Sequence, residues 1–219
     1  LLPGHVDSPM NYRDNAYDFR QDSSFLYFCG LQQPELALVL DIDAGSATLH
    51  GDDIGIDHLV WTGPLPSVAE RAALSGLART AGSAQLATAL AGARAAGRDV
   101  HFLKPFRGES RLALAAWLGL ADAQIDAAAS RALTQAVIAL RAVKTTGEVA
   151  EIENALHVTR DMHHLAMRMA RPGVVEQEIV GAMEGLALTH GRRLAYPAIF
   201  TSRGEILHNH DHSVRLKGG

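Results

Sequence analysis

Histidines at every second position, His208, His210 and His212, are the residues of this sequence best suited to chemistry. If the stretch is a β-strand, these imidazoles share one face while Asn209 and Asp211 take the other, because side chains alternate along a strand. Imidazole is a common metal ligand and also a donor that can polarise a scissile carbonyl. The pattern therefore leaves three interpretations: a metal site formed by the histidines, a hydrogen-bond donor to a carbonyl, or a polar strand end without chemistry.

The last third of the chain, residues 144–219, supplies the elements that would position these histidines. Thr145 and Glu148 form a capping box at the start of a predicted helix, and Pro172-Gly173 ends it. A second helix and a strand pair carrying the histidines follow. Since His163 lies on the apolar stripe of the first helix, we expect a core histidine satisfied by a hydrogen bond. That stripe consists of Val149, Ile152, Leu156, Thr159, His163, Ala166 or Met167, and Ala170.

Several short apolar runs in the first part of the chain indicate β-strands. Leu36–Ile42 and Ala47–His50 flank the turn residues 43–46 and predict a hairpin. Phe25–Phe28 precedes the hairpin and Val100–Leu103 follows it, and both are interpreted as further strands.

Helical spacing of apolar residues predicts helices between and after these strands. One helix is expected within Pro64–Gly82, and Leu86, Leu90 and Ala93 predict a second. Strands that alternate with helices predict an α/β N-terminal domain with a mixed sheet. A long helix over Asp122–Lys144 is expected to connect two domains, with the boundary near Leu133: residues 1–132 and residues 133–219.

Composition excludes several classes of protein. The chain has 219 residues, 47% of them hydrophobic, which suffices for a substantial core. Its net charge of -4 gives no basic field for nucleic acid or an anionic membrane, and no apolar run approaches a membrane span. The single Cys29 excludes an internal disulfide, and its apolar neighbours predict a buried thiol rather than a nucleophile. We therefore expect a cytoplasmic protein.

A series of residues, taken in order, carries a resemblance to a known family. In the last third it includes Lys144-Thr145, Glu148, Ile152, His163, Ala166-Met167, Arg171-Pro172-Gly173, Glu176, Tyr196-Pro197, Gly204, Ile206-Leu207-His208, Leu216 and Gly219. Upstream it includes Phe19-Arg20-Gln21-Asp22-Ser23, Phe25, Tyr27, Gly30, Pro34, Leu38-Val39-Leu40 and Trp61-Thr62-Gly63. The chain resembles the pita-bread metallopeptidases, nearest to the Xaa-Pro aminopeptidases (aminopeptidase P) and prolidases.

The resemblance implies a fold and an activity. The fold would be a creatinase-like N-terminal α/β domain followed by the first part of an α+β pita-bread catalytic domain. The activity would be that of a metal-dependent aminopeptidase that removes the residue preceding proline, with a proline-containing peptide as substrate and a homodimer as the common assembly. Within the family, His208 matches a position that contacts substrate and steadies the tetrahedral intermediate.

The resemblance also implies a cofactor that this chain does not hold. Two divalent ions, typically Mn²⁺, would share a hydroxide, and their Asp, His and Glu ligands are expected beyond Gly219, so the chain alone should be inactive. Alternatives are prolidase, the metal-free creatinase, and a pseudo-peptidase that serves as a binding module. Asn209 stands where aminopeptidase P often has Tyr, and His212 where many relatives have Asn, which leaves the specificity open.

A second charged stretch, residues 20–24, lies in the N-terminal part of the chain. We interpret it as a turn held by an internal Asp or Ser hydrogen bond. The resembled family can place this domain over the active site of a neighbouring subunit, so a minor role in function stays open.

Overall fold

The computed structural model describes residues 1–12 and 14–218, so Gly219 of the resemblance lies outside the described residues. The chain divides into two compact units, Leu1–Ala142 and Val143–Gly219. The predicted boundary near Leu133 lies inside the helix α7 (Arg131–Ala142), ten residues before this division. The boundary near Leu133 stays a prediction, because the two units are defined by contacts within the chain and not as domains.

A four-stranded mixed sheet forms the centre of the first unit. Its strands are β1 (Leu2–Pro3), β2 (Ala37–Asp41), β3 (Ser46–His50) and β4 (Thr80–Ala81), in that spatial order. Neighbouring strands are antiparallel except β3 and β4, which are parallel. The predicted hairpin is confirmed as β2 and β3, with Leu38 paired to Leu49. Gly45, at φ +59°, supplies the left-handed residue that this turn needs.

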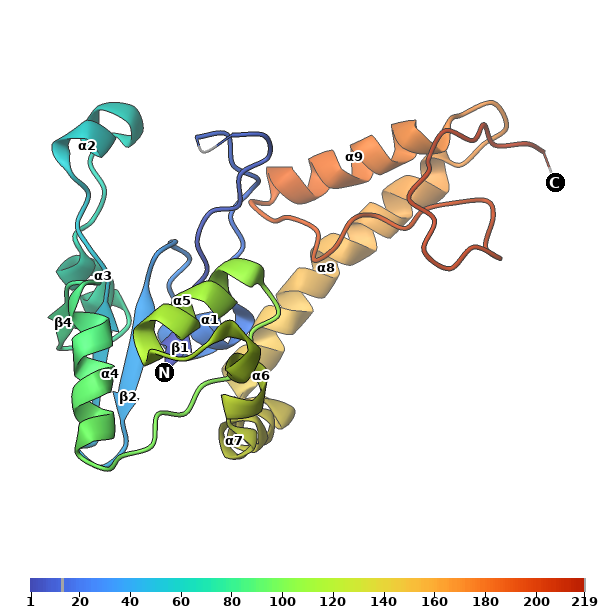
Figure 1. The fold of residues 1–219 in the computed structure, drawn as a ribbon. Coiled ribbons are helices and arrows are strands. Elements are labelled where there is room, and N and C mark those ends of the chain that lie inside the picture. Colours follow the sequence, from blue (N-terminus) through green and yellow to red (C-terminus); the bar gives the residue numbers. More distant parts are fainter. Residues whose placement is uncertain (13, 219) are drawn as a thin grey trace. The chain divides into compact units, whose positions relative to one another are not determined.

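Helices cover both faces of the sheet, as expected for an α/β domain (Figure 1). Leu38 packs on one face with residues of α1 and α3. Ala37 and Val39 point to the other face and pack with residues of α4, α5 and α6. The helices of this unit are α1 (Ser23–Cys29), α2 (Ile56–Thr62), α3 (Val68–Leu74), α4 (Gln85–Ala95), α5 (Gly108–Leu118), the 3₁₀ helix η1 (Asp122–Gln124), α6 (Ile125–Ala128) and α7.

The predicted strand Phe25–Phe28 is wrong, because these residues form most of α1. The Asp22 carboxylate accepts hydrogen bonds from the backbone N–H groups of Ser24 and Phe25, which caps the helix. Gly30, at φ +71°, ends the helix by donating its N–H to the Leu26 carbonyl. Phe25 and Cys29 then lie on one buried helical face.

The predicted strand Val100–Leu103 is also wrong, since it does not pair with the described sheet. Phe102 is nevertheless buried against α4 and α5, and its carbonyl accepts a hydrogen bond from the Ser130 N–H. The helix expected within Pro64–Gly82 is limited to α3, because Gly76 at φ +69° follows its end and residues 80–81 join the sheet.

The predicted long helix Asp122–Lys144 is broken into η1, α6 and α7. Ala129 has an extended backbone, and the Ser130 hydroxyl accepts a hydrogen bond from the Leu133 N–H at 3.1 Å. Ser130 therefore caps α7 and starts a new helix in place of continuing the old one. The second helix predicted from Leu86 and Leu90 is confirmed as α4, where both residues are buried.

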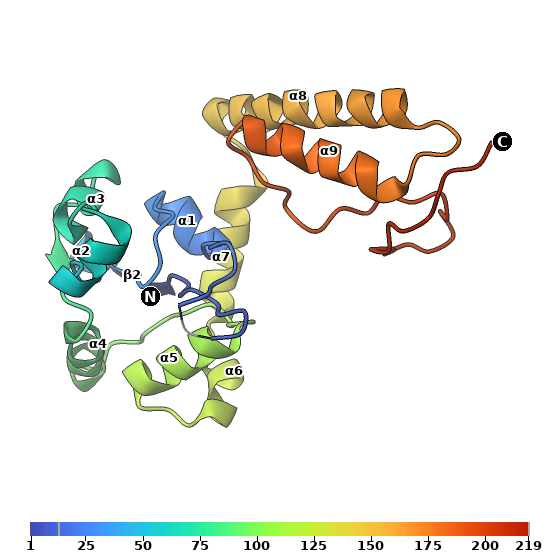
Figure 2. The ribbon, with the colours of Figure 1, turned by 90° about the horizontal axis from the view of Figure 1, so that it is seen from above.

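The second unit contains two helices that lie side by side, α8 (Thr146–Met169) and α9 (Glu176–Thr189), in Figures 1 and 2. The capping box at Thr145 and Glu148 is confirmed, with bonds of 3.2 and 2.8 Å. The buried stripe agrees with the predicted one only at Ala166, because Val158 and Met162 are also inside while His163 is exposed. His163 is therefore not a core histidine.

Among residues 1–12 and 14–218, no helix combines the length and apolar character needed to cross a lipid bilayer.

Candidate functional site

The histidines at positions 208, 210 and 212 lie in an irregular loop, and the predicted strand over 206–212 is wrong (Figure 1). The reason is local hydrogen bonding. The Asn209 side chain accepts from the Asp211 N–H, and the Asp211 carboxylate accepts from the Ser213 N–H, each at 3.0 Å. Such Asx turns satisfy the backbone without a strand partner. Hydrogen bonds from the side chain and the N–H of Ser213 also lower the pKa of Asp211.

His210 and His212 are anchored, whereas His208 is not. The Nδ1 atom of His210 bonds the Ala198 carbonyl at 3.2 Å, and that of His212 bonds the Phe200 carbonyl at 2.9 Å. His208 is exposed and forms no hydrogen bond or ion pair with the part of the chain that the structure describes. The anchors therefore leave His208 as the member of the set with both ring nitrogens available to a ligand.

Both ends of the histidine loop, residues 202–214, are bound to one buried residue, Glu176. The Glu176 Oε1 atom accepts hydrogen bonds from the Ser202 N–H at 2.6 Å and from the Ser202 hydroxyl at 2.8 Å. The Glu176 N–H donates to the Val214 carbonyl at 3.0 Å, and the Gln177 N–H donates to the His212 carbonyl at 2.9 Å. These carbonyls satisfy the first N–H groups of α9, which have no partner inside the helix.

The described residues do not fit a metal site. Over residues 1–12 and 14–218, no group of three or more His, Cys, Asp and Glu side chains is arranged to hold an ion. The interpretation in which His208, His210 and His212 form a metal site themselves is therefore not supported. A two-metal centre has no ligand set in this part of the protein.

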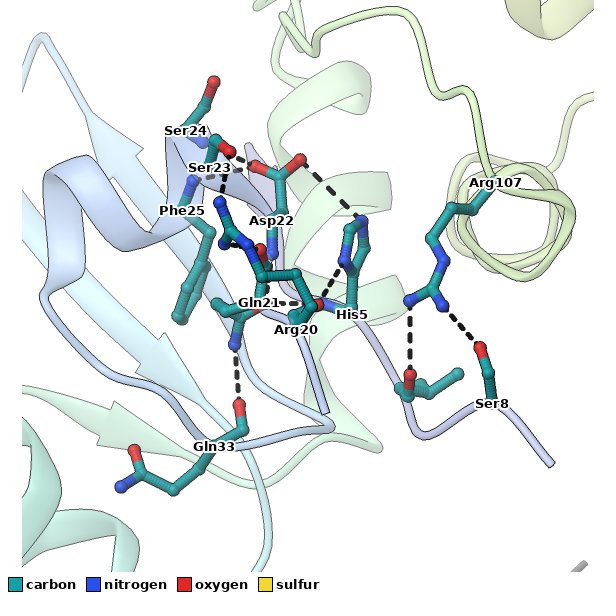
Figure 3. A network of polar contacts seen from close by, with 11 residues as sticks. His5, Ser8, Arg20, Gln21, Asp22, Ser23, Ser24, Phe25, Gln33 and Arg107 are labelled. Carbon is teal, nitrogen blue, oxygen red and sulfur yellow. Dashed lines mark hydrogen bonds and ion pairs between the residues drawn. The ribbon is translucent and has the colours of Figure 1, made fainter. Parts of the chain in front are cut away.

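The first unit holds a separate polar network at residues 20–24 (Figure 3). The Gln21 Oε1 atom accepts hydrogen bonds from the N–H groups of His5 and Asp22, at 2.7 and 2.8 Å. Its Nε2 atom donates to the Gln33 carbonyl at 2.6 Å. Arg20 donates to the Gln21 carbonyl and to the Ser23 hydroxyl. The predicted turn with an internal Asp hydrogen bond is thus present, as the cap of α1.

His5 of this network lies near a carboxylate, as many catalytic histidines do, but it does not line a substrate-sized cavity. Its Nδ1 atom bonds the Arg20 carbonyl at 2.9 Å, its Nε2 atom lies 3.8 Å from the Asp22 carboxylate, and its ring meets Phe106 edge to face. The adjoining cavity, lined by Phe106 and Arg107 among others, measures about 30 Å³. This is room for water and not for a peptide, so we assign the network to the fold.

In the sequence, Glu176 is one member of the family motif. Its contact with Ser202, which lies 26 positions away, was not predicted. The Pro-Gly break before Glu176 marks a helix start, where a carboxylate is favourable, but no local pattern identifies its partner. Gln21 lies in the predicted turn. The turn prediction did not include its burial, at 1% exposure, or its bonds to three backbone groups.

Comparison with known proteins shows what the first unit is similar to. Residues 1–101 match the model of the aminopeptidase P N-terminal domain. This part of the chain is similar to that domain family. Cys29, at the end of α1 in the same region, is buried as expected, and burial raises the pKa of its thiol.

Relatives in sequence extend the match beyond the N-terminal domain. Xaa-Pro aminopeptidase 3 of Rattus norvegicus is 24% identical over 98% of this chain and 45% of its own length. A probable Xaa-Pro aminopeptidase of Ajellomyces capsulatus is 24% identical over 92% of this chain and 42% of its own length. The chain therefore spans less than half the length of these relatives.

Solved structures show the same fold. Aminopeptidase P from E. coli in its low-pH form has a TM-score of 0.80 at 22% identity, covering 99% of this chain and 51% of that one. Pseudomonas aeruginosa aminopeptidase PepP has a TM-score of 0.80 at 23% identity over the same shares. A further E. coli structure is described as zinc-substituted and in complex with product. The expected fold, an N-terminal α/β domain with a mixed sheet and the beginning of a pita-bread domain, is confirmed.

Proposed function

We propose that this chain forms the N-terminal domain and the beginning of the catalytic domain of a metal-dependent aminopeptidase that removes the residue preceding proline. The observation that carries the proposal is the match to Xaa-Pro aminopeptidases over 92–98% of the chain. The proposed partner is a proline-containing peptide, and the proposed assembly is a homodimer.

His208 is the residue of this chain that we assign to substrate. Its imidazole is exposed at the tip of a loop whose neighbouring histidines are anchored to backbone carbonyls. A free imidazole there can donate a hydrogen bond to the scissile carbonyl and to the tetrahedral intermediate that follows. The assignment requires only a contact with substrate and no transfer of a proton to another residue of the chain.

The proposed function includes two metal ions, although the described residues do not bind them. Paired divalent ions, Mn²⁺ in this proposal, lower the pKa of bound water and stabilise developing negative charge. The described residues do not fit such a pair. The relatives are about twice as long, and we assign the ligands to the half that this chain does not match.

Two alternatives lead to different measurements. A dipeptidase of the prolidase type would cleave Xaa-Pro dipeptides, and a metal-free binding module would bind peptide without cleaving it. The cytoplasm is the proposed compartment, supported by the single buried cysteine.

A peptide assay separates these functions. The protein expressed from its complete coding sequence is incubated with Mn²⁺ and either an Xaa-Pro-Xaa tripeptide or an Xaa-Pro dipeptide. We expect release of the first residue from the tripeptide and loss of this activity after chelation. Cleavage of the dipeptide alone would indicate a prolidase, and binding without cleavage would indicate the module.

A further inference from the structure

Glu176 is a buried acid at the first position of α9, and buried acids are unusual in proteins. The residue is 0% exposed. Its Oε1 atom accepts both hydrogen bonds from Ser202, whereas its Oε2 atom accepts none from the described residues. Burying a carboxylate with one oxygen unsatisfied is costly, even where the amino end of a helix favours negative charge. Stability of the helix alone does not explain it.

The burial of Glu176 is explained by its contacts with the histidine loop. Its side chain binds Ser202 at the start of the histidine loop, and its N–H binds the Val214 carbonyl at the end. One residue therefore closes a loop of a size that proteins often use for function.

Further contacts extend this order from the base of the loop to its tip. The Asn209 side chain donates to the Thr201 hydroxyl at 2.9 Å, next to Ser202. His210 and His212 bond the carbonyls of Ala198 and Phe200. His208 directly precedes Asn209, so its position depends on a set of contacts whose base is Glu176.

We propose that Glu176 is a positioning residue that closes the loop of residues 202–214 and so holds His208 in the place from which it contacts substrate. The part about His208 rests on the proposed function. The part about loop closure does not, because it concerns the contacts of Glu176 alone.

Limited proteolysis tests loop closure. Arg203 lies within the loop with its side chain 58% exposed, so trypsin can report on the loop directly. In Glu176→Ala the Ser202 donors turn to water, and we expect cleavage after Arg203 to become at least about tenfold faster relative to cleavage after Arg160 in α8. An unchanged ratio would overturn the proposal.

Two further variants separate loop closure from other effects. Glu176→Gln keeps an oxygen that can accept from Ser202, so we expect its cleavage ratio to stay within about twofold of the unaltered protein. Glu178→Ala removes an acid from the same first turn, whose side chain accepts a hydrogen bond from the Val175 N–H, and should leave cleavage after Arg203 unchanged. Equal acceleration in all three variants would mean general loosening of α9 and would overturn the proposal.

Kinetics of the complete protein on an Xaa-Pro-Xaa tripeptide test the link to His208. If Glu176 acts through His208, Glu176→Ala lowers kcat/KM, and adding it to His208→Ala causes no further loss. If the double variant loses kcat/KM by the product of the two single losses, the link between Glu176 and His208 is overturned. If the unaltered protein cleaves no Xaa-Pro peptide, the proposed function and the role of His208 fail, while the trypsin ratios still decide whether Glu176 closes the loop.

Discussion

The Asp22 carboxylate lies 2.8 Å from the backbone nitrogen of Phe25 and accepts its hydrogen bond. The same oxygen accepts from the Ser24 N–H at 2.9 Å. Phe25 is fully buried in a core that also contains residues of the sheet and of α3, so the cap sets the start of a helix that contributes to this core. A single polar side chain thus fixes both the helix and the position of its buried aromatic residue.

Replacing Asp22 by alanine should lower the stability of the first unit. Loss of an N-cap acceptor costs about 1 kcal/mol of unfolding free energy. Asp22→Asn keeps an acceptor in the same place and should stay close to the unaltered protein. Urea unfolding followed by circular dichroism measures both. Equal unfolding free energies for Asp22→Ala and the unaltered protein would contradict the role of the cap.

Replacing Gln21 by alanine should be more damaging. Its side chain is buried and bonds backbone groups of His5, Asp22 and Gln33 (Figure 3). Leaving these buried groups unsatisfied is expected to cost about 2 kcal/mol or more. Gln33→Ala is the matched control, because the substitution keeps the backbone carbonyl to which Gln21 donates. If both variants unfold at the same urea concentration, Gln21 does not hold the network together.

The ion pair between Asp41 and Arg98 should make stability depend on pH. Arg98 donates to both Asp41 oxygens, at 2.9 and 2.5 Å, and lowers the pKa of that carboxyl far below its ordinary value of 3.8. Because the folded pKa is lowered, the stabilisation is complete well above pH 3.8 and is lost as the pH falls below it.

Thermal unfolding of Asp41→Asn tests this pH dependence. The variant should have a lower Tm than the unaltered protein at about pH 6, and the difference should shrink toward about pH 3. Asp57→Asn, at an exposed acid of α2, is the control. A difference in Tm that is constant over this range would show that the pair does not carry the effect.

The sequence predicted the fold well where local signals agree. Gly45 and the acceptor Asp41 mark the turn of the hairpin, and Thr145 with Glu148 marks the start of α8. The prediction was wrong where strand-like composition or alternation outweighed the signals for a cap or a turn. Phe25–Phe28 has the composition of a strand, yet the cap at Asp22 makes it a helix, and Asn209 begins a chain of Asx turns where alternation predicted a strand.

The assignment of His208 to the candidate site stays a prediction from its motif, and the geometry of the site could not be predicted from the sequence. His208 could be selected from its motif, but its exposure depends on anchors at Ala198 and Phe200 that lie 12 positions from His210 and His212. The contact between Glu176 and Ser202 is formed only when α9 and the loop fold together. Sequence spacing carries no information about such pairs.

The central claim is that His208 contacts substrate in an enzyme that cleaves before proline. The most direct measurement is kcat/KM for release of the first residue from an Xaa-Pro-Xaa tripeptide by the complete protein and its His208→Ala variant. Removing a donor to the intermediate should lower kcat/KM about 100-fold. His163→Ala, at another exposed histidine of the same unit, should leave it unchanged. Equal kcat/KM for His208→Ala and the unaltered protein, or no release from the tripeptide at all, would contradict the account.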